Sequence, residues 1–438
     1  MKILLLAFSV QQDVFPLGLH YLKGYATKYH PDVDIQIQEF SFGNRVSYET
    51  NKNLEIQALA YLALEKPDIV AFSCYIWSGE MIRDFVRSIK RLHPTMKIIL
   101  GGVEVSEHLL TPDVEFIIRQ EGEIAFKECI DYWKGTISKE QVHNVVYLNQ
   151  QKSPQQRQEN PSIELENLDE IPFPYSTNST NSTIDERYNV VRLETARGCL
   201  FDCHFCHYAK PTLRYFSLEY LHKNIPLLFQ NYSFENLTVL DANFNSNKER
   251  MFIILDIIEQ QVKKRQETKN PTNTKPLKLH CEMRPELMDE STIKKLENYS
   301  FKIDIELGLQ STDPVVLKEI NRPTHIGKVA AALQMLSASR KLTYKIDLMY
   351  GLPGDTFYKF LNSARFLLTH ATKQHKLVAH HSMLLNNTTL FEKKTVERYS
   401  ETHSSMIIKT PTQDVVELYK TKLFIDLLNK ELEIIKER

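Results

Sequence analysis

Residues 194–207 read ETARGCLFDCHFCH and hold three of the six cysteines of the chain, Cys199, Cys203 and Cys206. Thiols crowded into one short segment more often bind a metal than pair with one another. Six cysteines among 438 residues are also too few for a disulfide-rich secreted scaffold. We therefore expect a metal centre on this segment and a reducing compartment around the protein.

The chain downstream of this segment alternates apolar runs with helical patterns. Six such strand–helix units predict a partial (βα)6 barrel resembling a TIM barrel over 189–395, with its active site at the carboxyl ends of the strands. A helical tail is expected over 396–438. The candidate strands are Val190–Thr195, Asn236–Asp241, Leu277–Cys281, Lys302–Leu309, Lys345–Tyr350 and Leu377–Ser382.

The chain upstream of the cysteines shows a second α/β pattern. Residues 1–150 carry apolar runs without strict polar alternation, which is typical of strands covered by helices on both faces. We predict a doubly wound, Rossmann-like parallel sheet there, followed by a polar linker over 151–188 that is rich in Gln, Asn, Ser and Pro. The candidate strands are Lys2–Ser9, Asp34–Phe40, Asp68–Tyr75, Lys97–Leu100 and Val114–Ile118.

Composition excludes several classes of protein. The 42% hydrophobic and 25% charged residues are typical of a globular chain, and 54 basic against 55 acidic residues give a net charge of −1. We therefore expect no nucleic-acid partner, which would require a basic surface. No apolar stretch is long enough for a membrane span. The start, MKILLLAFSV, is interpreted as a buried strand and not as a signal peptide, so we expect a cytoplasmic protein.

The spacing of the three cysteines leaves the metal open. Three thiolates can bind three irons of a 4Fe-4S cluster and leave the fourth iron for another ligand. A zinc site with His204 or His207 as the fourth ligand is the alternative, because Cys3His sites are common structural centres. In that case the segment would belong to a structural zinc or binding module and not to an enzyme.

The segment RGCLFDCHFC, residues 197–206, resembles the cluster motif of the radical S-adenosylmethionine (SAM) superfamily. The resemblance implies that Cys199, Cys203 and Cys206 hold a 4Fe-4S cluster, and that Phe205 lies near the adenine of SAM. It also implies that SAM chelates the open iron and is cleaved to methionine and a 5′-deoxyadenosyl radical. An external electron donor of the flavodoxin or ferredoxin type is expected.

Other strand ends resemble superfamily positions less specifically. Asp241 stands where many members hold the amino group of SAM, with a helix N-cap as the alternative. Glu282 and Arg284 are candidates for the ribose or carboxylate of SAM, with a structural salt bridge as the alternative. Gln310 and Asp347 belong to segments that resemble the superfamily's GLQS and GLPG motifs, and they are candidate contacts to cofactor or substrate.

The first 150 residues resemble the cobalamin-binding domain of one radical SAM subgroup. The resemblance implies bound cobalamin, with its nucleotide tail near Ser73, Gly101 and Gly102, although a glycine pair after a strand is also ordinary turn chemistry. Many such domains supply an axial histidine from an Asp-x-His-x-x-Gly motif. Here Asp13 is followed by VFPLG, ending at Gly18, without that histidine.

These resemblances together imply a radical SAM enzyme. The subgroup's commonest reaction is cobalamin-dependent methylation of an unactivated carbon, so we expect a methyltransferase acting on a small molecule or peptide. The missing histidine leaves radical oxidation, rearrangement or cyclisation without methyl transfer as an alternative. His380 and His381 end the sixth strand, and one of them is a candidate acid or base that faces the barrel interior, since strand alternation lets only one point inward. No catalytic residue is assigned.

Overall fold

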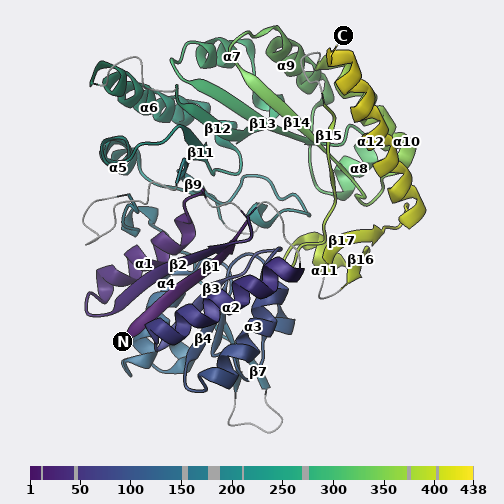
Figure 1. The fold of residues 1–438 in the computed structure, drawn as a ribbon. Coiled ribbons are helices and arrows are strands. Elements are labelled where there is room, and N and C mark those ends of the chain that lie inside the picture. Colours follow the sequence, from purple (N-terminus) through teal and green to yellow (C-terminus); the bar gives the residue numbers. More distant parts are fainter. Residues whose placement is uncertain are drawn as a thin grey trace. The chain divides into compact units, whose positions relative to one another are not determined.

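The computed structural model describes residues 1–10, 13–43, 48–149, 156–175, 188–209, 212–268, 276–371, 376–400 and 404–437. The chain divides into two compact units, unit 1 over Met1–Tyr188 and unit 2 over Asn189–Arg438, and Figure 1 labels their elements. The division falls where the sequence places the start of the barrel. No helix among the described residues has the length and hydropathy that a membrane span requires.

Unit 1 is built on a seven-stranded sheet in the order β2-β1-β3-β4-β5-β6-β7. The strands from β1 to β5 pair in parallel, whereas β6 and β7 add an antiparallel edge. This arrangement confirms the predicted doubly wound sheet. The strands are β1 (Lys2–Ser9), β2 (Asp34–Ser41), β3 (Ile69–Ser73), β4 (Lys97–Gly101), β5 (Phe116–Ile118), β6 (Val145–Asn149) and β7 (Gln156–Glu159).

Helices cover both faces of this sheet, which explains why β1 shows no polar alternation. Leu4, Leu6 and Phe8 pack into a core with α2 (Tyr48–Glu65) and α3 (Gly79–Leu92). The intervening Ile3, Leu5 and Ala7 pack into a second core with α1 (Leu17–Tyr29) and α4 (Glu123–Trp133). Successive side chains of a strand point to opposite faces, so a strand buried on both faces must be apolar throughout.

The described part of the expected linker belongs to unit 1. Residues 156–159 form β7, which pairs with β6. Leu168, Ile171 and Tyr175 are fully buried despite the polar residues around them. This finding corrects the linker prediction for residues 156–175. A few well-spaced apolar side chains are enough to pack this segment against the rest of unit 1. The rest of the expected linker, apart from Tyr188, lies outside the described residues.

Unit 2 contains six parallel strands in the order β15-β14-β13-β12-β11-β8. The order and the parallel pairing confirm the predicted partial barrel, whose outer helices are seen in Figure 1. The strands are β8 (Val190–Leu193), β11 (Asn236–Val239), β12 (Lys278–Met283), β13 (Lys302–Gln310), β14 (Thr343–Tyr350) and β15 (Val378–His381). The helices are α5 (Leu218–Asn231), α6 (Lys248–Thr268), α7 (Glu290–Glu297), α8 (Pro314–Glu319), α9 (Ile326–Ala338) and α10 (Phe357–His370).

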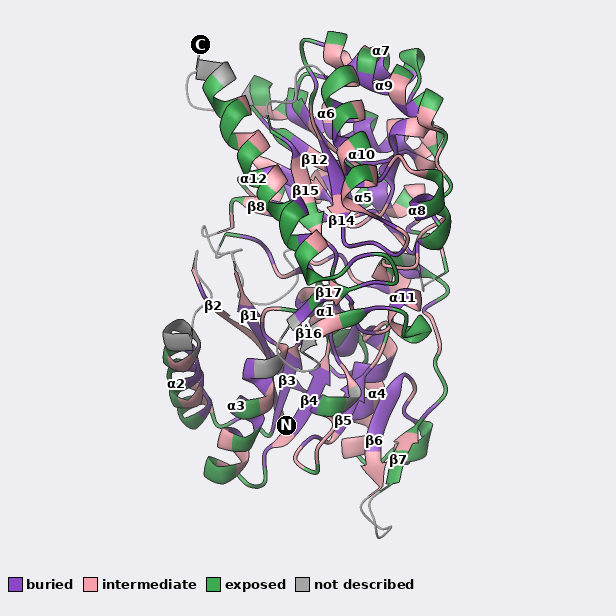
Figure 2. Cartoon of the chain, turned by 90° about the vertical axis from the view of Figure 1, so that its right-hand side faces the viewer, coloured by how far each residue is buried: buried purple, intermediate pink, exposed green. Residues whose placement is uncertain are grey.

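The end of the chain is partly different from the expected helical tail. After α11 (Thr389–Lys393), β16 (Glu397–Ser400) and β17 (Ser404–Lys409) form an antiparallel pair before α12 (Val415–Glu437) begins. The pair was not predicted from the sequence, because its strands are short and end in polar residues. Helix α12 packs on α10 through Phe424, yet much of its surface is exposed (Figure 2).

Candidate functional site

The cysteine segment leaves β8 through a tight turn whose backbone is fixed by Asp241. One carboxylate oxygen of Asp241 accepts hydrogen bonds from the backbone nitrogens of Thr195 (2.7 Å) and Ala196 (3.0 Å). Its other oxygen accepts from the Thr195 hydroxyl at 2.5 Å. Gly198 then adopts a φ of +79°, a conformation that suits glycine. The start of the segment is therefore held from the end of the neighbouring strand β11.

Asp241 thus has a partner that the sequence did not indicate. It is not a helix N-cap, because Asn243 stands at that position of the next helical turn. Burial raises the pKa of Asp241 to about 6, against the opposing effect of its hydrogen bonds to Thr195 and Ala196. Both of its oxygens face the chain itself, so a contact with SAM stays a prediction.

The three cysteines lie on the loop between β9 (Ala196–Arg197) and β10 (Arg214–Tyr215). Cys203 is buried, whereas Cys199 and Cys206 are partly exposed. Burial, together with the nearby Cys203 and Cys199, raises the pKa of Cys206 to about 11. Within the described ranges no three Cys, His, Asp or Glu side chains close around a single ion. In a cluster each thiolate binds a different iron, so such closure is not required.

The cluster segment is anchored to the turn that follows α8. The His204 backbone nitrogen donates to the Ile320 carbonyl (3.0 Å), and the Asn321 side chain donates to the Asp202 carbonyl (2.7 Å). Nδ1 of the His204 ring lies 2.8 Å from the Glu319 carbonyl oxygen. The contact of Nδ1 with the Glu319 carbonyl fixes the His204 ring but leaves Nε2 available, so the zinc alternative is not decided by this geometry.

Two buried arginines stand beside the thiols. Nη1 of Arg322 lies 3.6 Å from the sulfur of Cys203, and the guanidinium of Arg284 stacks 3.8 Å from the ring centroid of Phe201. Each guanidinium keeps one buried N–H, Nη1 of Arg284 and Nε of Arg322, without a partner among the described residues. Unpaired buried donors beside three thiols fit an anionic metal cluster held by those thiols.

Arg284 was predicted from the sequence as a candidate contact to SAM, whereas Arg322 was not predicted. Arg284 forms a salt bridge with Glu286 and donates to the Pro323 carbonyl at 2.7 Å, which matches the structural alternative stated for it. Arg322 stands in a turn between two helices, where no periodic pattern marks it. A contact between Arg284 and SAM stays a prediction.

Phe205 lies where two small apolar clusters meet. It packs against Leu384 and Leu390 on one side, and against Ile320 and Leu352 on the other. Leu352 belongs to the GLPG-like segment that follows β14. The structure therefore brings Phe205 next to this segment, as expected for two elements of one cofactor site, and its contact with adenine remains a prediction.

The inner face of the barrel carries a chain of charged side chains. His280 lies 3.3 Å from Asp304 and 3.4 Å from Glu306, and Lys345 lies 2.7 Å from Glu306. Asp347 continues the chain, at 3.9 Å from Lys345 and 3.4 Å from His380. We call these residues the lumen chain, namely His280, Asp304, Glu306, Lys345, Asp347 and His380. Of these, Asp347 was predicted as a contact to cofactor or substrate, and His380 was one of two candidates for an acid or base that faces the lumen.

The lumen chain follows from strand alternation. In β13, Ile303, Ile305 and Leu307 are buried under the helices, while Asp304 and Glu306 between them face the other side. The stretch KIDIELGLQ therefore contained the signal, because acidic residues at every second position of an otherwise apolar strand mark a polar face. The interiors of complete barrels are mostly filled with branched apolar residues, so this polar interior suits a ligand.

Two of the predicted residues, Glu282 on β12 and Gln310 on β13, lie near the carboxyl ends of their strands. Burial raises the pKa of Glu282 to about 7, with the charge of Glu306 as the second cause, although the side chain still meets solvent. Glu282 forms no hydrogen bond or ion pair with any described residue. Gln310 has a φ of +69°, and its amide lies against Gly308, where a Cβ would be 2.8 Å from Nε2. The two side chains remain candidate ligand contacts.

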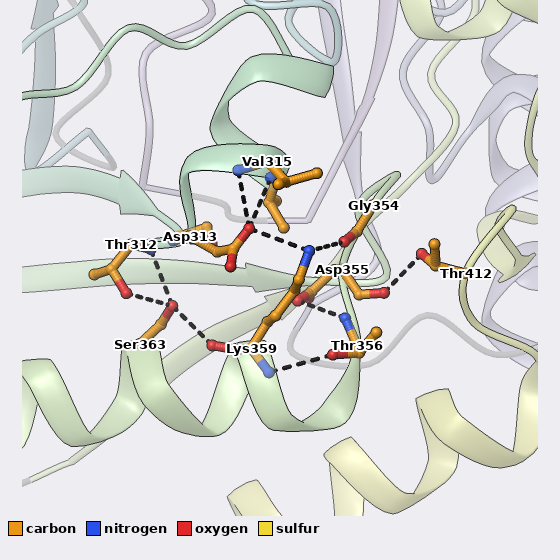
Figure 3. A network of polar contacts seen from close by, with 11 residues as sticks. Thr312, Asp313, Val315, Gly354, Asp355, Thr356, Lys359, Ser363 and Thr412 are labelled. Atoms are coloured by element: carbon orange, nitrogen blue, oxygen red, sulfur yellow. Dashed lines mark hydrogen bonds and ion pairs between the residues drawn. The ribbon is translucent and has the colours of Figure 1, made fainter.

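The GLQS-like and GLPG-like segments are fixed to one another by a polar network (Figure 3). Nζ of Lys359 donates to the Gly354 carbonyl (2.8 Å) and lies 3.2 Å from Asp313, which caps α8. The Thr412 hydroxyl donates to the Asp355 carbonyl at 2.7 Å. Burial raises the pKa of the Asp355 carboxyl to about 7. These two loops are therefore held rigidly at the carboxyl ends of β13 and β14.

In unit 1, the three residues predicted near cobalamin stand at the carboxyl ends of β3 and β4. Ser73 ends β3, Gly101 ends β4, and the Cys74 backbone nitrogen donates to the Gly101 carbonyl at 2.6 Å. Gly102 has a φ of +107°, and a Cβ there would stand 2.5 Å from the Cys74 oxygen. Backbone geometry alone therefore requires Gly102, as the turn alternative states, and the cobalamin contact stays a prediction.

No histidine occupies the expected axial position in unit 1. His20 lies in α1 and stacks on Phe15 with 4.1 Å between ring centroids. Burial lowers the pKa of His20 to about 3, so its ring is neutral. Its packing against Phe15 makes it a structural residue of this unit.

Comparison with known proteins identifies both units. A B12 binding domain matches residues 3–130, and a radical SAM superfamily domain matches residues 193–367. The chain therefore carries a B12-binding domain followed in the sequence by a radical SAM domain, which confirms the predicted family. This family implies a 4Fe-4S cluster and SAM, and the B12-binding domain implies cobalamin, as predicted.

The chain spans about half the length of two curated relatives. The 2-(S-pantetheinyl)-carbapenam-3-carboxylate methyltransferase of Streptantibioticus cattleyicolor is 26% identical over 69% of this chain and 45% of that protein. The cobalamin-dependent radical SAM methyltransferase TokK of Streptomyces tokunonensis is 25% identical over 76% of this chain and 49% of its own length.

Solved structures agree with the fold of this radical SAM protein. The cobalamin-dependent SAM radical enzyme OxsB matches with a TM-score of 0.70 and 15% identity, over 96% of this chain and 65% of that chain. The radical SAM methyltransferase TsrM from Kitasatospora setae matches with a TM-score of 0.66 and 14% identity, over 92% of this chain and 76% of that chain. At these identities the likeness concerns the fold alone.

Proposed function

We propose that this chain is a cobalamin-dependent radical SAM methyltransferase that methylates an unactivated carbon of a small molecule. The observation that carries the proposal is the three-cysteine loop at the open end of a six-stranded barrel, preceded by a B12-binding domain. When bound, the cluster supplies the electron that cleaves SAM to a radical, and cobalamin carries the methyl group.

The chain's own residues position these groups. In this proposal Cys199, Cys203 and Cys206 bind three irons. Asp241 holds the backbone that leads into the loop, and the turn after α8 holds its middle through Asn321. A loop that is held at two points can keep the cluster in one orientation. Catalysis requires such a fixed orientation of the reacting groups.

The substrate is proposed to enter the inner face of the barrel with a polar group toward the lumen chain. Lys345, His280 and His380 supply cationic donors, whereas Glu282 offers an unpaired carboxylate. Burial opposes ionisation of Glu306, but hydrogen bonds, first that from His280, outweigh it and lower its pKa. Burial raises the pKa of Asp347. A small molecule or a peptide with hydroxyl, amine or carboxylate groups would find hydrogen-bond or ion-pair partners here.

Radical chemistry without methyl transfer is the second candidate. It is favoured by one observation, the absence of an axial histidine between Asp13 and Gly18, since His20 is packed on Phe15. Retention of hydroxocobalamin after desalting of anaerobically purified protein would support methyl transfer. Protein that retains none would leave oxidation, rearrangement or cyclisation.

We also propose a reducing, cytoplasmic location and an electron donor of the flavodoxin or ferredoxin type. All six cysteines are free thiols, as a reducing compartment requires. A low-potential cluster needs such a donor for each turnover. A pull-down from the native host's extract under anaerobic conditions, followed by reduction assays with purified flavodoxin, tests the partner.

Anaerobic reconstitution with iron and sulfide tests the proposal as a whole. We expect charge-transfer absorbance of an iron–sulfur cluster and formation of 5′-deoxyadenosine from SAM only when dithionite is added. Stoichiometric zinc without SAM cleavage would contradict it and would favour a structural module.

A further inference from the structure

Two arginines lie buried beside the cysteine loop although they do not belong to the superfamily's cysteine motif. Arg284 follows β12 and is 4% exposed, and Arg322 follows α8 and is 8% exposed. Arginine is almost never buried to this degree unless it is paired. The reason for burying two such charges next to three thiols therefore has to be found in their contacts.

Arg322 is held with its guanidinium against a cluster thiol. Its Nη2 donates to the Gly308 carbonyl, its backbone nitrogen donates to the Leu317 carbonyl at 2.8 Å, and its Nη1 lies 3.6 Å from the Cys203 sulfur. A Cβ at position 308 would lie 3.2 Å from Nη2. The glycine of the GLQS-like segment thus leaves space for this guanidinium.

Arg284 is held by other partners but points to the same place. It donates to Glu286 through Nε at 2.6 Å and to the Pro323 carbonyl, and it stacks on Phe201, which lies between Cys199 and Cys203. Its Nη1 and the Nε of Arg322 are both buried, and neither has a hydrogen-bond partner among the described residues. An unsatisfied buried donor of a charged group is costly.

The electrostatics require an anion beside these arginines. Arg284 and Arg322 are both buried and both stand beside the cysteine loop, so their positive charges repel each other. Among the described residues Arg284 pairs with Glu286, but Arg322 forms no ion pair with a carboxylate. Three thiolates around a dipositive iron–sulfur core carry a net charge of minus one, which falls to minus two on reduction.

We propose that Arg322, supported by Arg284, is a positioning residue that donates to the Cys203 thiolate and raises the reduction potential of the cluster. In the reduction an added low-potential reductant gives one electron to the cluster, and no covalent bond forms or breaks. A fixed cation with an N–H directed at sulfur stabilises the reduced state, which is more negative, more than the oxidised state. The inference rests on the proposed function because it requires the cluster.

The test is the midpoint potential of the reconstituted full chain, measured without SAM by an EPR-monitored redox titration. Arg322→Gln should lower the equilibrium constant for reduction at least tenfold, which is about 59 mV for one electron. Arg322→Lys keeps the positive charge but loses the forked guanidinium, so its midpoint potential should lie between those of the wild type and Arg322→Gln. Lys318→Gln, which removes an exposed charge from α8, should leave the potential unchanged.

The outcomes separate this inference from the proposed function. An Arg322→Gln protein with full iron content and the wild-type potential would overturn it, and weaker SAM binding alone would assign the arginine to SAM instead. If Arg322→Gln does not load iron, Arg322→Lys decides, and a wild-type potential in that variant overturns the inference. A wild-type chain that binds no cluster would refute the proposed function itself.

Discussion

Two inner strands, one from each sheet, use their alternate residues differently. Strand β1 of unit 1 buries Ile3, Leu4, Leu5 and Leu6 completely, because helices cover both faces. Strand β13 of unit 2 buries every second residue and places charged or polar side chains on the other face. A parallel sheet covered on both faces offers a ligand only its strand ends, whereas an open barrel also offers its inner face.

The largest effect is expected on the cluster of unit 2. Cys203→Ala should abolish iron binding and SAM cleavage, since two thiolates cannot hold a three-iron face of the cluster. Cys281→Ala is the matched control, because Cys281 is a fully buried thiol of β12 and should be replaceable without loss of iron. Iron and sulfide content after reconstitution distinguish them. Full iron content in the Cys203→Ala protein would refute the ligand assignment.

The doubly covered strand should be more sensitive to truncation than the polar face of the barrel. Leu5→Ala should cost about 2–5 kcal/mol of the free energy of unfolding of unit 1, because it leaves a cavity in a closed core. Both tryptophans of the chain, Trp77 and Trp133, lie in unit 1, so tryptophan fluorescence during urea unfolding reports on this unit.

Glu306→Gln, on the polar face of β13, is the comparison variant. Because both tryptophans lie in unit 1, its urea unfolding is followed by far-ultraviolet circular dichroism, and the midpoint for unit 2 should stay where it is in the wild type. A shift as large as that of Leu5→Ala would contradict the distinction between the two sheets.

A smaller effect is expected at the strand ends of unit 1. Gly102→Ala forces a side chain into a positive φ and against the Cys74 backbone, which should cost about 1–3 kcal/mol. Gly101→Ala is the matched control, because its Cβ would meet only ordinary contacts at 3.7 Å. The same urea transition, followed by tryptophan fluorescence, measures both. Equal costs for the two variants would show that backbone geometry is not what requires Gly102.

The smallest effect concerns protonation of the lumen chain. The hydrogen bond to Asp304, followed by that to Glu306, raises the pKa of His280 from 6.5 to about 9. The stability that the protonated ring contributes is complete below pH 6.5 and is lost as the pH rises through 9. Asp304→Asn should lower this pKa, as an NMR titration of the histidine rings would measure. An unchanged His280 pKa in the Asp304→Asn protein would contradict the contact between His280 and Asp304 in the lumen chain.

Much of the fold could be predicted from periodicity, and less of the site. The parallel strands of both sheets were expected within a few residues, because buried parallel strands form continuous apolar runs, whereas the antiparallel strands β6 and β7 were not expected. The charged positions of β13 were visible in the sequence, but their partners on β12, β14 and β15 depend on register. Arg322 and the role of Asp241 could not be predicted, since a turn and a strand end become neighbours of the cysteines only in the folded chain.

The EPR spectrum of the reduced, reconstituted protein with and without SAM tests the central claim most directly. If three cysteines hold a cluster with one open iron, the reduced protein shows an iron–sulfur signal that changes when SAM is added. A protein without such a signal, or with a signal that SAM leaves unchanged, would contradict the account.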